Sequence, residues 1–218
     1  MTEQLLRRTM NELCPMTDLP TALSAPPVAR QPLHTRKVEC QGYIRDDGLF
    51  DIEGRITDTK AYAFDNHHRG TVNTGEPIHD MFVRITVDND LTIVASEAFS
   101  ASTPYDICPL AALNFKRLVG IRIGAGYMRK VKAVYGRDKG CTHILEILYP
   151  LGTTAYQTVF PYQEYQRRLA GESEGKSMRH GPPLNSCYAF SPKRSVVKTL
   201  WPEKYEGPEE DDEADAAA

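Results

Sequence analysis

Polar and apolar residues alternate strictly in two neighbouring segments, residues 38–45 and 50–56, on either side of the sequence Asp46-Asp47-Gly48. The apolar members of this alternation are Val38, Cys40, Ile44, Phe50, Ile52 and Ile56. A period of two that continues across an Asp-Gly turn predicts a β-hairpin with one apolar face. The other face carries charges of both signs, which cross-strand ion pairs explain more simply than catalysis does.

A second hairpin is predicted from residues 81–87 and 91–98, which flank the turn Asp88-Asn89-Asp90. Both faces of these strands are fairly apolar, as expected for a central pair of strands that is covered by helices. Between the two hairpins, residues 63–76 are mostly polar and include the adjacent pair His67-His68. This segment is expected to form a loop with solvated histidines.

Three helices are predicted after the strands, because the hydrophobic period becomes helical. They cover residues 103–120, 127–135 and 141–169. The first begins either at Thr103-Pro104-Tyr105-Asp106, which has the form of a capping box, or at Pro109. The third is expected to be kinked at Pro150 and Gly152 before it continues from Thr153 to Leu169.

Strands followed by helices are typical of an α+β fold, here an antiparallel sheet of about four or five strands with three helices packed on one face. Residues 34–170 are predicted to form this single domain. The proline-rich residues 1–33 are expected to be a flexible arm. Residues 171–202 are expected to be extended, with a hairpin that turns at Ser191-Pro192, and residues 203–218 to be a disordered acidic tail.

Composition narrows the choice of partners. The chain has 218 residues and a net charge of −3, which predicts neither nucleic-acid nor membrane binding. Eight acidic residues and one basic residue lie between Glu203 and Asp215, as is typical of a solvated tail. No run approaches the ~18 apolar residues of a membrane span. Leu5-Leu6 is followed by Arg7-Arg8 rather than by the apolar core of a signal peptide.

The cysteines are odd in number and widely scattered, at positions 14, 40, 108, 141 and 187. Without an export signal, this pattern indicates reduced thiols in a cytoplasmic protein. The expected partner is a small molecule or another protein, and the sequence does not identify it.

The candidate chemistry centres on the start of the third predicted helix, where Cys141, His143 and Glu146 follow Gly140. A thiol, an imidazole and a carboxylate are the groups that a metal site or a nucleophilic site needs, and a helix start favours a thiolate. Two other segments carry ligand-type residues before a strand and before a helix. The predicted metal ligands are His79, Asp80, Cys108, Cys141 and His143. Mixed ligands of this kind suit zinc, and histidine with carboxylate suits iron(II).

Two other interpretations of these residues remain open. In a metal-free enzyme, Cys141 would be a nucleophile or acid–base group with His79 or His143 as its partner. Glu146 would orient His143 from the same side of the helix, and Tyr105 would donate a proton. In the structural interpretation, the same cysteines and histidines form a buried, satisfied cluster without chemistry.

Four stretches carry a resemblance to a known family: "DGLFDIEGRITDTKAY", "PIHDMFVRITVDNDLTI", "TPYDICPLA" and "GCTHILEILYPLGTTAYQT". Over roughly residues 33 to 165 the chain resembles a bacterial family catalogued as domain of unknown function 2889. The family has no established activity, so the resemblance implies a fold and no reaction.

The order of the second hairpin, two helices and a cysteine-initiated helix also resembles iron–sulfur cluster assembly scaffolds of the NifU/SufU type. Those scaffolds place cluster or zinc ligands at three points, which correspond here to Pro77–Asp80, Ser100–Cys108 and Cys141–His143. Cys141 matches the cysteine of the scaffold's last helix. The first point offers His79 and Asp80 instead of a cysteine, and the second offers serines or a displaced Cys108.

The sequence therefore predicts a pocket formed by His79, Asp80, Cys141 and His143 that binds a metal, with zinc or iron as candidates, or a small ligand. Such a pocket could belong to an enzyme. The alternative is a non-catalytic accessory or scaffold protein with a buried structural cysteine–histidine cluster.

Overall fold

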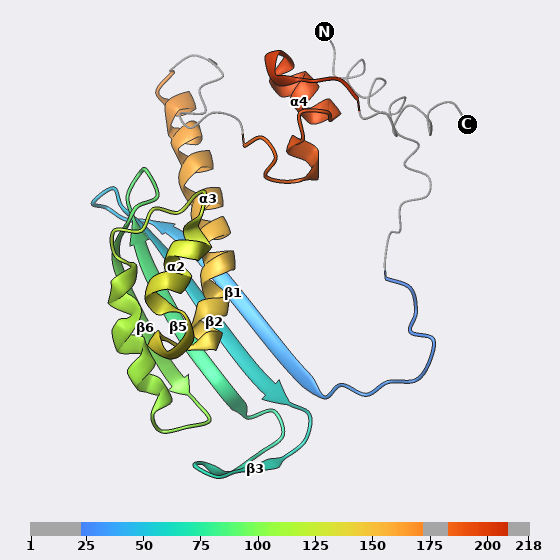
Figure 1. Cartoon of the computed structure of the whole chain (residues 1–218), viewed down its shortest axis with the longest axis vertical. Helices are drawn as coiled ribbons and strands as arrows, with labels where there is room; N and C mark the ends of the chain where they lie inside the picture. The colour runs from blue at the N-terminus through green and yellow to red at the C-terminus, as the bar shows by residue number, and fades with distance from the viewer. Residues whose placement is uncertain (1–22, 172–182, 209–218) are drawn as a thin grey trace. The chain divides into compact units, whose positions relative to one another are not determined.

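The fold is built on a four-stranded antiparallel sheet (Figure 1). In the computed structural model, which describes residues 23–171 and 183–208, the strands are arranged in the order β1-β2-β5-β6. Their bounds are β1 His34–Ile44, β2 Phe50–Lys60, β5 Pro77–Val87 and β6 Ile93–Ser102. The two predicted hairpins are thus confirmed, and β2 and β5 join them in the middle of the sheet.

The predicted loop over residues 63–76 was wrong, because it contains a small two-stranded sheet of β3 (Phe64–Asn66) and β4 (Gly70–Val72). The side chain of Asn66 closes the turn by accepting hydrogen bonds from the backbone N–H groups of His68 and Arg69, each at 3.0 Å. Val72 is fully buried. A side chain that satisfies the turn and one buried anchor are sufficient for this short pairing.

Three helical elements cover one face of the sheet (Figure 1). Their bounds are η2 Cys108–Leu118, α2 Tyr127–Tyr135 and α3 Thr142–Leu169, with a short η3 at Arg137–Lys139 between the last two. Helix α2 matches its prediction, whereas η2 is a 3₁₀ helix that starts at Cys108. The predicted α+β arrangement is therefore confirmed.

Helix α3 runs as one element through Pro150 and Pro161, and the predicted kink at Pro150 and Gly152 stays a prediction. Proline removes a backbone donor from a helix. Packing outweighs this local cost, because most helical stability in proteins comes from burial of an apolar face. The buried residues of α3 are Ile144, Ile147, Leu148, Leu151, Gly152, Ala155 and Val159.

The core lies between the sheet and these helices. Alternate residues of β2 are buried, beginning with Phe50, Ile52 and Gly54, because side chains of a strand point to opposite faces. The same alternation in β5 buries Met81 and Val83. The intervening side chains form the outer face of the sheet, opposite the face that η2, α2 and α3 cover (Figure 1).

Helix α3 approaches β1 and β2 closely at two glycines. A Cβ atom added to Gly54 would lie 2.5 Å from Cγ2 of Ile147 and 3.0 Å from Cδ1 of Leu151. A Cβ atom on Gly42 would collide with the side chain of Thr158. These glycines set α3 over the boundary between β1 and β2, and this position brings its first turn to the end of the sheet.

The residues from Tyr162 onward belong to a second compact unit. Its described part includes η4 (Tyr188–Phe190), α4 (Ser195–Leu200) and η5 (Pro202–Lys204). The predicted hairpin at Ser191-Pro192 was therefore wrong. Val197 and Trp201, four residues apart, are both buried, and this is a helical spacing. The predicted arm and acidic tail fall mostly on residues 1–22 and 209–218, outside the described part.

Among the described residues, no helix combines the length and apolar character that a membrane crossing requires.

We expect Gly54→Ala to lower the free energy of unfolding by about 1–3 kcal/mol, because the added methyl group overpacks the contact with Ile147 and Leu151. Urea unfolding monitored by circular dichroism measures the change. Thr35→Ala, on the exposed side of β1, serves as a control and should change stability by less than about 0.5 kcal/mol. An unchanged stability for Gly54→Ala would contradict the close approach of α3.

Candidate metal centre

The buried apolar rows of two central strands end in polar residues. On β2, Asp58 follows Ile56 in the inward-facing register and has no exposed surface. On β5, His79 precedes Met81 in the corresponding row. Asp58 and His79 are direct cross-strand partners. The inner face of the sheet therefore finishes in a carboxylate beside an imidazole.

The first turn of α3 adds a second imidazole. The ring of His143 stacks on the ring of His79, with centroids 3.5 Å apart and an interplanar angle of 30°. His143 Nε2 lies 3.9 Å from Asp58 Oδ2. Asp58, His79 and His143 each offer one ligand atom, and these atoms all lie within 4.8 Å of one another. Three segments far apart in sequence thus meet at one point.

Strand β1 supplies the groups that hold the buried carboxylate. Arg36 binds Asp58 with both sides of its guanidinium fork, Nε to Oδ1 and Nη2 to Oδ2, each at 2.8 Å. His34 Nε2 lies 3.0 Å from Oδ1, and His79 Nδ1 lies 2.9 Å from Oδ2. Both oxygens of Asp58 therefore have two partners each, as a buried carboxylate requires.

These partners keep Asp58 ionised. Burial by itself would raise the pKa of Asp58, but the hydrogen bonds and positive charge of Arg36, with a smaller contribution from His34, outweigh it and lower the pKa to about 2. The centre therefore carries a fixed negative charge at neutral pH.

The two stacked histidines are shifted toward the neutral form. Burial lowers the pKa of His79, and the neighbouring His143 lowers it further. Burial also lowers the pKa of His143, followed by the positive charge of Arg36. Neutral imidazole has a free lone pair and is the form that binds metals.

Two other predicted site residues border the centre. Cys141 Sγ lies 3.8 Å from His143 Nδ1 and 3.9 Å from the sulfur of Met81. Glu146 forms an ion pair with Arg36, although the sequence predicted that it orients His143. Cys141 thus lies beside Nδ1 of His143, and Glu146 binds Arg36, which in turn binds Asp58.

The structure does not bring three of the predicted residues into the group of Asp58, His79 and His143. Asp80 follows His79 directly, so it points to the outer face of the sheet, where Arg55 donates hydrogen bonds of 2.8 and 3.0 Å to it. Cys108 begins η2. The exposed Tyr105 packs edge-on against the ring of His68. The predicted four-residue pocket is therefore corrected: it keeps the two histidines and loses Asp80 to the opposite face.

Sequence reasoning missed Asp58, Arg36 and His34. A signal for Asp58 was available, since it continues the two-residue period of buried positions after Ile52 and Ile56. A carboxylate in a buried register needs a compensating partner. The register of the hairpin places Arg36 directly opposite Asp58. Each of these residues lies two positions beyond the predicted strand segments 38–45 and 50–56, so the pair was not predicted.

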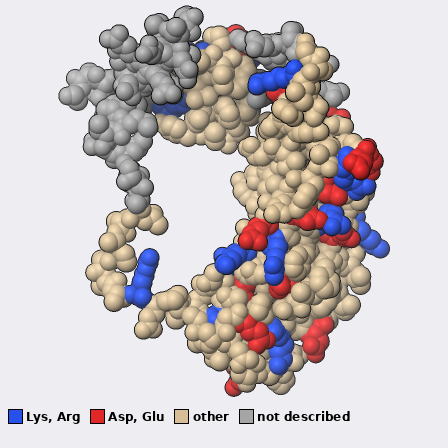
Figure 2. All heavy atoms as spheres, turned by 180° about the vertical axis from the view of Figure 1, so that it is seen from behind, with Lys and Arg blue, Asp and Glu red and all other residues tan. Residues whose placement is uncertain are grey.

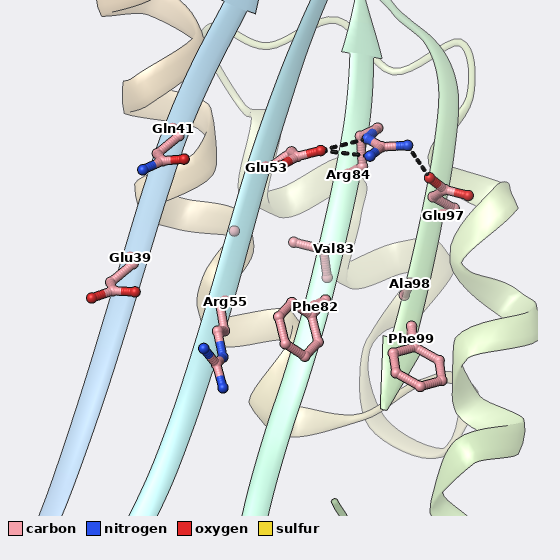
Figure 3. Close-up of a pocket in the computed structure, with 11 residues that line it drawn as sticks. Glu39, Gln41, Glu53, Arg55, Phe82, Val83, Arg84, Glu97, Ala98 and Phe99 are labelled. Carbon is pink, nitrogen blue, oxygen red and sulfur yellow. Dashed lines mark hydrogen bonds and ion pairs between the residues drawn. The ribbon is translucent and has the colours of Figure 1, made fainter. Parts of the chain in front are cut away.

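The outer face of the sheet holds a shallow depression of about 460 Å³ on the side away from the centre (Figure 3). Arg84 bridges Glu53 and Glu97 there, and Arg55 lies 4.8 Å above the ring of Phe82. Acidic and basic side chains are interspersed over the molecule seen from behind (Figure 2). Of the charged side chains that line the depression, Glu53, Arg55, Arg84 and Glu97 are held in ion pairs, which leaves little free chemistry there.

Comparison with known proteins identifies one family. A family model described as "Protein of unknown function (DUF2889)" matches residues 34–157, which is more than half of the chain and includes Asp58, His79 and His143. The chain belongs to the DUF2889 family. No curated protein matches the chain. No solved structure matches it either, so the resemblance to iron–sulfur scaffolds stays a prediction.

The stability of chelator-treated protein should fall in two stages as the pH is lowered. His79 and His143 bind protons less readily in the folded protein than in the unfolded chain, because their pKa values are lowered. Their contribution to the free energy of unfolding is therefore complete above about pH 6.5 and is lost as the pH falls below it. Asp58 contributes about 2 kcal/mol above about pH 4, and this is lost as the pH approaches 2. Urea unfolding at a series of pH values measures both stages.

Asp58→Asn should remove the fall in the free energy of unfolding below about pH 4. Asp65→Asn, at the exposed position of β3, should leave that fall unchanged. Equal slopes for the two variants below pH 4 would show that Asp58 is not the controlling carboxylate.

Proposed function

We propose that this protein binds one divalent transition-metal ion through Asp58, His79 and His143. The observation that carries the proposal is the convergence of three ligand-type side chains from β2, β5 and α3, with ligand atoms within 4.8 Å of one another. Direct ligands of one ion must lie about 2.0–2.2 Å from it, which separates neighbouring ligand atoms by about 3–3.5 Å. The distances of 2.9 and 3.9 Å from Asp58 Oδ2 to the two histidines bracket this range.

The ligand set favours zinc or iron(II). Two histidines and one carboxylate leave coordination positions open, as in catalytic zinc sites and in mononuclear iron(II) sites. An iron–sulfur cluster would need several thiolates, and Cys141 is the thiol in contact with His143. We therefore favour a mononuclear ion over the cluster that the scaffold resemblance implied.

Charge and protonation support the same conclusion. The ionised Asp58 supplies the negative charge, and the lowered pKa values of His79 and His143 leave both imidazoles neutral near pH 7. Arg36 occupies one side of each carboxylate oxygen, and His79 Nδ1 lies 2.9 Å from the other side of Oδ2. A metal ion would take the place of the proton between His79 Nδ1 and Oδ2. Asp58 would then be a ligand through Oδ2, the oxygen that faces both histidines.

Elemental analysis and calorimetric titration of chelator-treated protein test the proposal. We expect about one equivalent of zinc or iron(II) to bind, because the three residues form one centre. His79→Ala and His143→Ala should each weaken binding by more than about tenfold, since each removes a direct ligand.

His68→Ala is the matched control, since His68 is a half-exposed histidine of the same domain that pairs with Asp106. It should bind metal like the unmodified protein. If no ion binds, or if all three histidine variants behave alike, the proposed metal centre is refuted and a structural role for the cluster remains.

A second function is favoured by the different contacts of the two ring nitrogens of His143. Nδ1 lies 3.8 Å from the sulfur of Cys141, and Nε2 lies 3.9 Å from a carboxylate oxygen of Asp58. A thiol, an imidazole and a carboxylate in this order can form a nucleophilic site, with the imidazole accepting the thiol proton. Cys141 also precedes the first residue of α3, where unpaired backbone N–H groups can stabilise an anion.

Alkylation of metal-free protein by iodoacetamide tests this second function. Cys141 should react faster than Cys187 despite its lower exposure, because the thiolate is the reacting form and His143 can accept the thiol proton. Mass spectrometry of the digested protein follows both thiols in one sample, so Cys187 is an internal control. His143→Ala should slow Cys141 about tenfold and leave Cys187 unchanged. A Cys141 that reacts no faster than Cys187 would exclude an activated thiol.

A further inference from the structure

The two edges of the sheet are not equivalent. The edge strand β6 is bonded at its first residue by a later segment, with backbone hydrogen bonds from Ile93 N–H to Ile121 O and from Gly120 N–H to Ile93 O. The other edge strand, β1, pairs only with β2 among the described residues. Ten of its eleven residues are exposed. A long open edge of this kind is a template for pairing with another strand.

The backbone register identifies which groups of β1 are unused. Ala61 N–H bonds to Leu33 O at one end of the hairpin, and Arg45 N–H bonds to Leu49 O at the other. Antiparallel strands bond through alternate residues, so the odd-numbered residues of β1 bond to β2. The even-numbered residues therefore direct their N–H and C=O groups away from the sheet: His34, Arg36, Val38, Cys40, Gly42 and Ile44.

Two charges on the outer face of β1, Lys37 and Glu39, are not held in close ion pairs, although Glu39 lies opposite Arg55 across the hairpin and its charge acts on that guanidinium. On β2, β5 and β6 the outer charges form ion pairs, such as that of Arg55 with Asp80. Within the described part of the chain, neither Lys37 nor Glu39 belongs to an ion pair, and Glu39 stands without a dashed partner in Figure 3. These opposite charges lie two residues apart, on either side of Val38.

We propose that two copies of this chain pair through β1, antiparallel and about a two-fold axis at Val38. In this register Val38 faces Val38 of the second copy, and Lys37 of each copy faces Glu39 of the other. The unused backbone groups of the even-numbered residues then bond to one another, which makes one eight-stranded sheet. The odd-numbered pairs are the non-hydrogen-bonded ones, whose side chains lie closest together. Charge complementarity selects a second copy as the occupant.

The covering helices permit this pairing. Helix α3 lies over the boundary of β1 and β2, as its contacts with Gly42 and Gly54 indicate. Strands are about 4.8 Å apart, so the two α3 helices would be separated by about two strand spacings, or ~10 Å, which is an ordinary helix-packing distance. Arg36 points inward from β1 and would oppose pairing as a free charge, but Asp58 and Glu146 both bind it.

The pairing would also reach the candidate metal centre. The backbone groups of Arg36 would bond to Cys40 of the second copy, and those of His34 to Gly42. Strand β1, whose Arg36 and His34 bind the carboxylate of Asp58, would then be hydrogen-bonded along both of its edges.

Charge reversal tests the register. Light scattering coupled to size exclusion should find a dimer of the full chain at micromolar concentration. Lys37→Glu and Glu39→Lys should each weaken the dimer by about tenfold or more, because like charges then face each other. The double variant Lys37→Glu/Glu39→Lys should restore it. Circular dichroism should show an unchanged fold in all three.

A monomer at every concentration would overturn the proposal. A dimer that is unaffected by the single reversals, or that the double variant fails to restore, would overturn it as well, since another surface would then hold the copies together.

A cysteine cross-link provides an independent measurement. Val38→Cys should form a disulfide-linked dimer under mild oxidation, because the two introduced thiols face each other at the axis. Gln41→Cys, on the same strand but six residues from its own copy across the axis, should remain at the background of the unmodified protein. Equal cross-linking of the two variants would exclude the register at Val38.

Discussion

The buried carboxylate of Asp58 is the constraint on which the described domain depends. An isolated carboxylate without exposed surface is strongly unfavourable, so it requires positive or donating groups in fixed positions. Arg36 provides them with a two-pronged contact across the hairpin, and Glu146 ties the same guanidinium to α3. The guanidinium group of Arg36 therefore links β1, β2 and α3. A shift of the register by one residue would turn Asp58 to the outer face and leave Arg36 without it, so this pair also specifies the pairing of the strands.

The same constraint explains why two histidines can stack face to face. With centroids 3.5 Å apart, two charged imidazoles would repel, and burial together with Arg36 makes the second charge still less favourable. The domain therefore holds two neutral imidazoles against one anion. This arrangement suits a bound metal cation beside the ionised Asp58. A proton transferred from the thiol of Cys141 would make His143 positively charged, and the negative charges of Asp58 and Glu146 are what favour that step. Both proposed functions depend on one electrostatic feature, and they differ in which nitrogen of His143 is used.

The sequence predicts the sheet and the helices well because each has a clear period, as in Val83 and Ile85 of β5 or the short amphipathic helix α2. It also identifies His79 and His143, whose residue types stand out beside apolar runs. It misplaces Asp80 because adjacent residues of a strand face opposite sides, and a sequence motif does not carry that geometry. It misses Asp58 because the partner that makes its burial acceptable lies 22 residues away, on the other strand of the hairpin. Helix α3 continues through Pro150 because packing against the sheet, a tertiary effect, outweighs the lost backbone hydrogen bond.

Strand β1 is an exposed edge strand, yet its side chains make most of the contacts to the buried carboxylate of Asp58. Its side chains are almost all exposed, so it gains little from burial, yet Arg36 and His34 make the ionised Asp58 tolerable. Exposed edge elements with few buried contacts open locally at lower free energy than the core. Opening β1 would remove three of the four contacts to the carboxylate, leaving the one from His79. A ligand or a second chain that binds only the closed arrangement must then also hold β1 in place, because its binding free energy is added to the closed state alone. Occupation of the centre and pairing of the open edge would therefore stabilise the same strand, and each would favour the other.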